Sequence, residues 1–185
     1  MNPLEVIEKY YQKDSKLYET LMNHSMSVQK KALEIVDKNP HLEVDRQFIA
    51  EAALLHDIGI FKTDAPRIFC QGTFPYIAHG YLGADLLRQE GFPKHALVCE
   101  RHTGCGLALW MIKSRKLPVP CRKMEPITLE EQIICFADKF YSKTHLNEEL
   151  PLTKIRKKML RFSKQSLVRF DKWYLEFYGE KLPPL

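Results

Sequence analysis

Apolar residues recur along this chain at intervals of three and four, which is the spacing that places side chains on one face of an α-helix. The clearest stripe steps by four, three, four, four and three, through Leu17, Leu21, His24, Val28, Ala32 and Ile35. Alternation of apolar and polar residues, the mark of a half-buried strand, is scarce. The pattern therefore predicts an all-α fold.

We expect a single-domain bundle of about seven helices, because the chain contains about seven stretches with helical periodicity. Asp45 is a predicted N-cap of the third helix, and Thr128 and Glu131 form a predicted capping box before the sixth. The stretch 58–76 is irregular and typical of a functional lid or wall, and 105–126 is a mixed connection containing prolines. The predicted helices cover residues 3–13, 15–38, 45–56, 77–89, 94–102, 132–143 and 152–178.

Composition supports one globular domain over residues 1–185, because 45% of the residues are hydrophobic and 28% are charged. No apolar run approaches the ~20 residues of a membrane span, so we expect no membrane contact. The N-terminus lacks the features of a secretory signal, and the five cysteines form no Cys-x-x-Cys motif. Reduced thiols and a cytoplasmic location are the expectation.

Histidines and aspartates interrupt the apolar faces of five different helices. One histidine on such a face is more often a hydrogen-bonded core residue than a metal ligand. Five independent interruptions are better explained by one shared, buried cation cluster, whose imidazole and carboxylate groups suit Fe, Mn, Co, Ni or Zn. The candidate ligands are His24, His56, Asp57, His79, His102 and Asp138.

Glycines accompany these candidates. We expect Gly59, directly after His56-Asp57-Ile58, to end its helix in the left-handed conformation. Gly80 and Gly83 lie inside a predicted helix, where each costs roughly 1 kcal/mol relative to alanine. They indicate close approach of a neighbouring helix or a ligand, with ordinary helix packing as the alternative.

The order of His24, then His56-Asp57, then Asp138 resembles the H…HD…D signature of the HD-domain superfamily of metal-dependent phosphohydrolases. His-Asp-Ile-Gly at 56–59 is the form found in its HDIG subset. The resemblance covers about residues 20–145. It implies that those four residues bind one ion, and that Asp57 bridges to a second ion held by His79 and His102.

The resemblance also implies an activity: hydrolysis of a phosphate ester or anhydride, in a nucleotide or a similar small molecule, by metal-activated water, with Asp57 as a catalytic residue. Many members with two metals carry a basic residue directly after His-Asp-Ile-Gly. This chain has Ile60 there, and Lys62 is the nearest substitute. The departure weakens the expectation of diester cleavage but leaves metal binding intact; monoester, dinucleoside polyphosphate and diester cleavage stay open.

Basic residues near the candidate ligands are candidates for binding the substrate phosphate. We favour Arg101, adjacent to His102, and Lys139, adjacent to Asp138, with Lys62 as the replacement for the missing residue. Arg67 and Lys143 have the same chemistry, but for each a solvated surface charge is the simpler interpretation.

Other interpretations remain. A regulatory module that binds metal or nucleotide without turnover is the main alternative, although the ligand set is complete. The basic run 154–164 raises nucleic-acid binding, but a net charge of only +5 favours a solvated helix face. The apolar stripe of the last helix is typical of core and is also compatible with a dimer interface.

Overall fold

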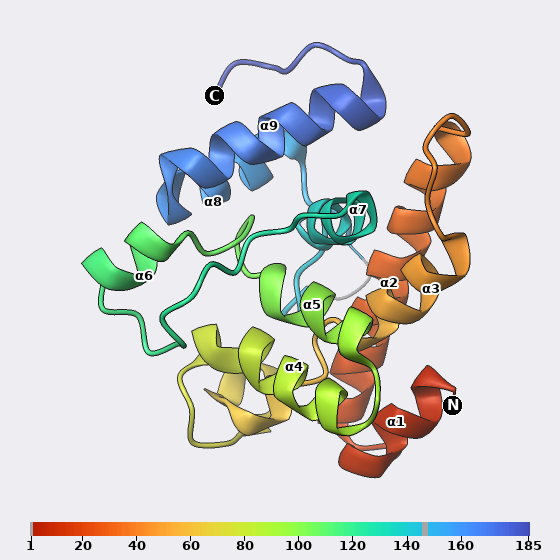
Figure 1. Cartoon of the computed structure of the whole chain (residues 1–185), viewed down its shortest axis with the longest axis vertical. Coiled ribbons are helices and arrows are strands. Elements are labelled where there is room, and N and C mark those ends of the chain that lie inside the picture. The colour runs from red at the N-terminus through yellow and green to blue at the C-terminus, as the bar shows by residue number, and fades with distance from the viewer. Residues whose placement is uncertain (1, 146–147) are drawn as a thin grey trace.

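The computed structural model describes residues 2–145 and 148–185, and within them the protein is a bundle of α-helices (Figure 1). The sheet structure in these described residues is one two-stranded antiparallel sheet, with β1 at Asp64–Ala65 and β2 at Cys70–Gln71. The prediction of an all-α fold is confirmed. The helices are α1 Pro3–Tyr10, α2 Lys16–Lys38, α3 Arg46–Leu55, α4 His79–Gln89, α5 Pro93–Arg101, α6 Leu109–Ser114, α7 Leu129–Asp138, α8 Leu152–Phe162 and α9 Lys164–Tyr178.

Side-chain caps explain where several helices begin. The Ser15 hydroxyl accepts a hydrogen bond from the Tyr18 amide, and the Asp45 carboxylate accepts one from the Phe48 amide. At α7 the Thr128 hydroxyl accepts from the Glu131 amide, but the Glu131 carboxylate accepts from the amide of Ile127, so the predicted capping box is only half formed.

The helices bury two main clusters of apolar side chains. The larger one lies between α2, α3, α7, α8 and α9, and it contains the fully buried Phe136 and Phe170. The second lies between α1, α4, α5 and the ends of α2 and α3, around Leu21 and Leu55. Figure 1 shows α7 in the middle of the molecule, between the α8–α9 pair and the α4–α5 pair. The place where the two apolar clusters meet therefore lies near the middle of the molecule.

Two predicted helices have different bounds in the structure, and one predicted connection contains a helix. The predicted helix 152–178 is broken at Ser163, whose extended backbone and hydroxyl cap the start of α9. The helix after the predicted cap at Thr128 begins there as expected, but it ends at Asp138 instead of Lys143, and the connection 105–126 contains the short α6. The described residues hold nine α-helices, which roughly matches the predicted count of about seven.

Gly59 also differs from its prediction. Its backbone is right-handed, with φ −82°, so it is not a left-handed helix terminator. Glycine is needed there for space, because a Cβ would lie 2.2 Å from the His79 carbonyl oxygen and 2.5 Å from the Gly83 nitrogen. Gly83 in turn approaches the Cys99 sulfur, so these glycines let the His56-Asp57 segment, α4 and α5 meet closely.

Candidate metal centre

All six candidate ligands lie at one place, at the junction of the two apolar clusters. His24 lies in the middle of α2, and His56 and Asp57 directly follow α3. The other three lie at helix ends: His79 begins α4, His102 follows α5 and Asp138 ends α7. All are buried except Asp138, whose side chain is 11% exposed. Residues 114 positions apart, such as His24 and Asp138, are within hydrogen-bond distance.

Asp57 lies between two groups of nitrogen donors. Its Oδ2 is 3.1 Å from His24 Nε2 and 3.0 Å from His56 Nε2. Its Oδ1 is 3.4 Å from the Nε2 atoms of both His79 and His102. With Asp138 joining the first group, the donors form a set of four and a set of three that share only Asp57. Each set could hold one cation, with the Asp57 carboxylate bridging the two.

Backbone carbonyl groups orient three of the imidazole rings. The Nδ1 atoms of His56, His79 and His102 lie 2.7, 2.6 and 2.7 Å from the carbonyl oxygens of the residues three positions earlier. Since a carbonyl can only accept, each Nδ1 carries a proton, and in the neutral ring each Nε2 presents a lone pair to the cluster. This arrangement, with the second ring nitrogen fixed by an outer partner, is typical of metal-binding histidines.

Unpaired polar atoms in the centre fit a bound cation. Asp57 Oδ1 and His56 Nε2 are buried without a hydrogen bond. The Nε2 atoms of His79 and His102 face each other at 3.0 Å, although both rings donate their Nδ1 proton elsewhere. Burying such atoms unpaired is costly, and a divalent metal would pair them all. The mixture of imidazole and carboxylate ligands suits Fe, Mn, Co, Ni or Zn.

Burial and neighbouring charges set the charge states of these groups. Burial opposes a charge on His56, but Asp57 and Asp138 raise its pKa to about 9, so a metal bound there would displace a proton. Burial opposes ionisation of Asp57 and Asp138, but neighbouring Lys143 and His56 hold the pKa of Asp57 well below its ordinary value, and Lys139 does the same for Asp138. Burial lowers the pKa of His79 to about 3 and also lowers that of His102. At neutral pH the carboxylates are therefore ionised and both of these imidazoles are neutral.

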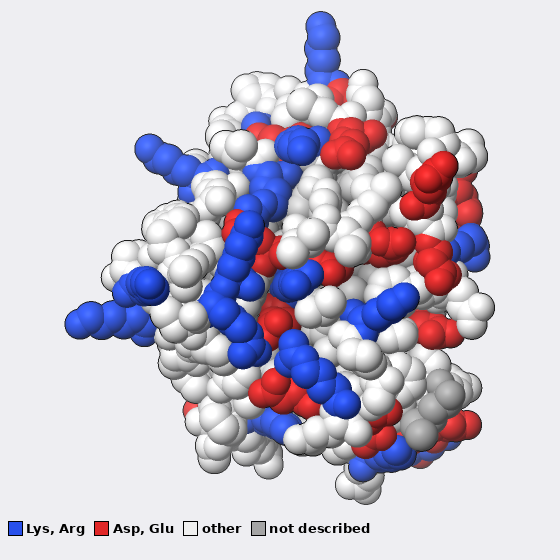
Figure 2. All heavy atoms as spheres, viewed as in Figure 1, with Lys and Arg blue, Asp and Glu red and all other residues white. Residues whose placement is uncertain are grey.

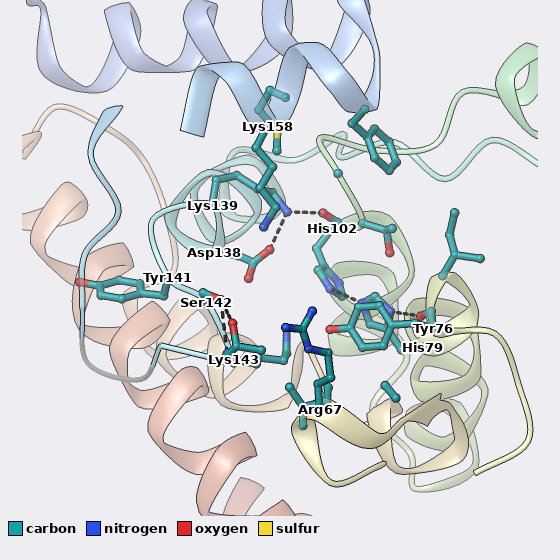
Figure 3. A pocket seen from close by; sticks show the side chains of 18 of the residues that line it. Arg67, Tyr76, His79, His102, Asp138, Lys139, Tyr141, Ser142, Lys143 and Lys158 are labelled. Carbon is teal, nitrogen blue, oxygen red and sulfur yellow. Dashed lines mark hydrogen bonds and ion pairs between the residues drawn. The ribbon is translucent and has the colours of Figure 1, made fainter. Parts of the chain in front are cut away.

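A cavity of about 650 Å³ opens from the centre to the surface and is lined by His79, His102 and Asp138 (Figure 3). Lys139 and Lys143 lie at its inner end. The Lys139 ammonium donates to the His102 carbonyl oxygen at 2.8 Å and to Asp138 at 2.5 Å. Lys143 Nζ lies 2.5 Å from Asp57 Oδ2. The cavity thus brings two buried ammonium groups to the donor cluster.

Sequence reasoning gave too little weight to Lys143 and did not name Tyr76. Lys143 is not helical, because α7 ends five residues before it and the chain turns back towards Asp57. Tyr76 stacks on the His79 ring, with ring centroids 4.7 Å apart, and lines the cavity. The sequence contains one indication that Tyr76 lies near the centre: it ends the irregular stretch 58–76 and precedes His79 by three residues.

Two predicted phosphate-binding residues lie elsewhere. The Arg101 guanidinium donates to both carboxylate oxygens of the buried Glu131, at 2.8 and 2.9 Å, and does not line the cavity. Neighbouring residues near a helix end point in different directions, so adjacency to His102 did not bring Arg101 to the site. The Lys62 Nζ atom lies 5.9 Å from the centroid of the Phe61 ring, and Lys62 does not line the cavity either.

Comparison with known proteins identifies a family. Residues 21–142 match the HD domain family. The chain is 37% identical over 123 residues to Uncharacterized protein MJ0778 of Methanocaldococcus jannaschii, a match over 65% of each protein. No solved structure was found to match the chain.

Two further relatives are named tRNA (cytidine(56)-2'-O)-methyltransferase. The Thermoplasma volcanium protein is 29% identical over 97% of this chain, and the Picrophilus torridus protein is 32% identical over 66% of it. The matches cover 47% and 31% of those two proteins, so the chain spans less than two thirds of each relative.

None of the helices in residues 2–145 and 148–185 combines the length and hydrophobicity that a membrane crossing requires.

Proposed function

Because the chain belongs to the HD domain family, we propose that it hydrolyses a phosphate ester or anhydride, in a nucleotide or a related small molecule. One observation carries the proposal. The two oxygens of Asp57 face two different groups of donors, at the inner end of an open cavity that also holds two lysines. This combination suits the activation of water and the neutralisation of a phosphate in one place.

The donor set defines which residues would hold metal. His24, His56, Asp57 and Asp138 would bind one ion, and Asp57, His79 and His102 would bind the second. Bound divalent metal would supply the Lewis acidity that lowers the pKa of water and offsets the charge on phosphoryl oxygens.

The chain's own groups bind and orient the substrate in this proposal. Lys139 and Lys143 stay protonated at neutral pH, because burial is outweighed by the nearby carboxylates, which raise the pKa of each. Two fixed ammonium groups favour a phosphate over a neutral ligand. Tyr76 and Phe162 form part of an apolar wall next to them, suited to a base or sugar. A nucleotide satisfies both parts of the cavity.

The names of the two methyltransferase relatives bear on the substrate but not on the reaction. The matched segment is less than half of each of those proteins, so we do not transfer methyl transfer to this chain. Their named substrate is a tRNA, which is compatible with a nucleotide or an RNA-derived substrate here. We still regard general nucleic-acid binding as the weaker proposal.

The alternative is a module that binds metal or nucleotide without turnover. To separate the two, the purified protein would be loaded in turn with Mn, Fe, Co, Ni or Zn and incubated with a panel of nucleotides and phosphate esters. We expect steady release of phosphate or of a shorter nucleotide with at least one metal. Nucleotide binding without turnover under every condition would favour the regulatory module.

Asp57→Ala is the matched variant for this test, because it removes the bridge but leaves the five other donors. We expect loss of hydrolysis to the background rate, together with loss of tightly held metal measured by elemental analysis. Metal content equal to that of the parent protein would contradict the assignment of Asp57 as the bridging ligand. Hydrolysis by this variant at the parent rate would contradict the proposed mechanism.

A further inference from the structure

A second cavity, of about 570 Å³, adjoins the one that opens from the metal centre. The two cavities share Ser142, Thr144, Lys158 and Arg161 on their walls. None of the six candidate metal ligands lines the second cavity. It is therefore reached from the donor cluster by passing through the first cavity, and a ligand filling both would be longer than the first alone accommodates.

One face of α8 gives this second cavity its charge. Lys154, Lys157, Lys158 and Arg161 follow one another at intervals of three, one and three, so they lie on one side of the helix. The same helix turns Arg156 the other way, where it is buried and donates to the Asp171 carboxylate at 2.8 and 2.9 Å. The basic run that looked uniform in the sequence thus divides into one structural arginine, four cavity residues, and Lys164, which begins α9 outside both cavities.

The four cavity residues have no acidic partner among the residues that the structure describes. Arg88, Arg101, Arg122 and Arg169, in contrast, are all ion-paired. No Asp or Glu of the described chain lines the second cavity, and Asp138 alone lines the first. Like charges at a spacing of four destabilise a helix, so this arrangement has a cost that a bound anion would remove.

Lys158 connects the two cavities. Figure 3 shows its side chain reaching beside Lys139, while Lys143, Arg67 and Tyr76 lie across the cavity from it. Burial lowers the pKa of Lys158, and the neighbouring charges of Lys139 and Lys143 act in the same direction, against Asp138. On the face seen in Figure 2, by comparison, Lys and Arg lie interspersed with Asp and Glu. Lys158, which lines both cavities, thus brings its charge close to those of Lys139 and Lys143.

One wall of the first cavity is apolar. Tyr76, Ile77, Met159 and Phe162 give the first cavity an apolar side suited to a nucleoside. Together the two cavities therefore present a metal and ammonium site, an apolar wall beside it, and a second cationic site on α8. A ligand in which a nucleoside separates two phosphate groups would use all three.

We propose that the substrate is a nucleotide with a second phosphate beyond its nucleoside, held by Lys154, Lys157, Lys158 and Arg161 on α8. This chemistry occurs in a nucleoside 3′,5′-bisphosphate and in the phosphorylated end of an oligonucleotide. The proposal rests on the proposed function, because it takes the phosphate at the donor cluster to be the one that is cleaved.

Isothermal titration of the intact, metal-loaded protein with adenosine 3′,5′-bisphosphate and with AMP would test the second phosphate site. Chromatography of the titrated mixtures would show whether either nucleotide is cleaved. We expect the bisphosphate to bind at least about tenfold more tightly, since a charge-assisted contact typically contributes that much. The difference should shrink as salt is raised, because these lysines are solvent-accessible. Equal affinity for the two nucleotides would overturn the proposal.

A charge-reversal variant, Lys154→Glu together with Lys157→Glu, would locate the site. We expect it to lose most of the bisphosphate preference, with a smaller loss for Lys154→Gln with Lys157→Gln. The control is Lys172→Glu with Lys181→Glu, which changes net charge equally at exposed positions outside both cavities. Circular dichroism would verify that each variant is folded. If the control variant lost as much of the preference for the bisphosphate, the preference would depend on overall charge alone, and the proposal would be overturned.

Two further ligands distinguish the sources of the second phosphate. A 5′-phosphorylated dinucleotide that binds as tightly as the bisphosphate supports an oligonucleotide end, and one that binds only like AMP supports the small bisphosphate. ATP carries its phosphates in one consecutive chain. If ATP gained the same affinity and lost it in the charge-reversal variant, the order phosphate, nucleoside, phosphate would be wrong.

The readouts also separate this proposal from the proposed function. Cleavage of both nucleotides without any affinity difference would refute the second phosphate site and leave the hydrolase intact. A preference that depends on Lys154 and Lys157, without cleavage under any metal, would refute the hydrolase and retain the second site.

Discussion

At the scale of single residues, the centre depends on where each polar atom points. Asp57 faces nitrogen donors with both oxygens, and carbonyl groups hold the rings of His56, His79 and His102 with Nε2 inward. The other tautomer of a ring would present an N–H proton instead of a lone pair. Ligand type alone therefore does not define the site; the backbone three residues before each histidine defines it as well.

His79→Ala and His102→Ala test the division into two ion sites. Each change removes one donor from the set of three and none from the set of four. We expect either variant to hold about one metal per chain where the parent holds two, measured by elemental analysis after gel filtration. Parent stoichiometry in either variant would favour a single-ion site with His79 and His102 as outer residues.

Arg101 and Glu131 make a prediction about stability. The Glu131 side chain is only 3% exposed, so removing its partner in Arg101→Ala leaves a buried carboxylate without its cation. We expect a loss of about 3 kcal/mol in the free energy of unfolding, measured by urea denaturation. This is the lower end of the cost of removing one partner from a buried ion pair, because Arg101 is partly exposed.

The control for this pair is Glu131→Gln in the Arg101→Ala background. The neutral amide still accepts from the Ile127 amide, so much of the lost stability should return. A raised KM for a phosphate substrate, at unchanged stability of Arg101→Ala, would instead support the original prediction that Arg101 binds phosphate.

At the scale of elements, the close approach of three segments positions the ligands. Gly59 contacts the backbone of α4 at His79 and Gly83, and Gly83 contacts Cys99 on α5. These contacts bring the ends of α3, α4 and α5 together, and three of the ligand-bearing segments meet there. The sequence prediction that glycines in α4 mark a close approach is confirmed, and the neighbours are helix α5 and the Gly59 segment.

Gly83→Ala tests this packing. In an exposed helix this substitution stabilises by about 1 kcal/mol, but here the new Cβ would lie 2.5 Å from Cys99 Sγ and 2.9 Å from the Gly59 nitrogen. We expect destabilisation of about 1–3 kcal/mol by urea denaturation. Adding Cys99→Ala should recover only part of it, because the Gly59 backbone remains.

The exposed Gln89→Ala change on the same helix serves as the control, and it should stay within about 0.5 kcal/mol of the parent. Stabilisation by Gly83→Ala would show that α4 can move away from Gly59 without cost, and the close contact would then have no role in the site.

At the scale of the whole molecule, the donors come from α2, from the ends of α3 and α5, and from α4 and α7. A cation bound by all of them would link segments that belong to both apolar clusters. Since unfolding separates these segments, metal bound to the native protein stabilises it by mass action. The candidate site is therefore also a candidate source of stability.

Metal removal should measure this linkage. At a free metal concentration of about 100 times Kd, binding adds about 2.7 kcal/mol, which for a chain of this size is a rise in Tm of roughly 5–10 °C over the chelated protein. Scanning fluorimetry with EDTA and with added Mn or Zn would report it. The rise should largely vanish in Asp57→Ala, and an undiminished rise in that variant would place the stabilising metal elsewhere.

Local sequence was sufficient to predict the helical class, most helix starts and the set of candidate ligands. Helical periodicity and caps such as Ser15 and Asp45 act over three or four residues, so they can be read directly from the chain. His24 and Asp138 stood out because a polar group on an apolar stripe conflicts with burial unless it has a partner, and that conflict is also local.

Tertiary structure alone decided which groups meet. It turned Lys143 towards Asp57 and Arg101 towards Glu131, although both residues are basic and close in sequence to a ligand. It also broke the last helix at Ser163 and placed one face of α8 beside the cavities. The direction of a long side chain and the role of a glycine depend on neighbours distant in sequence, which no local pattern records.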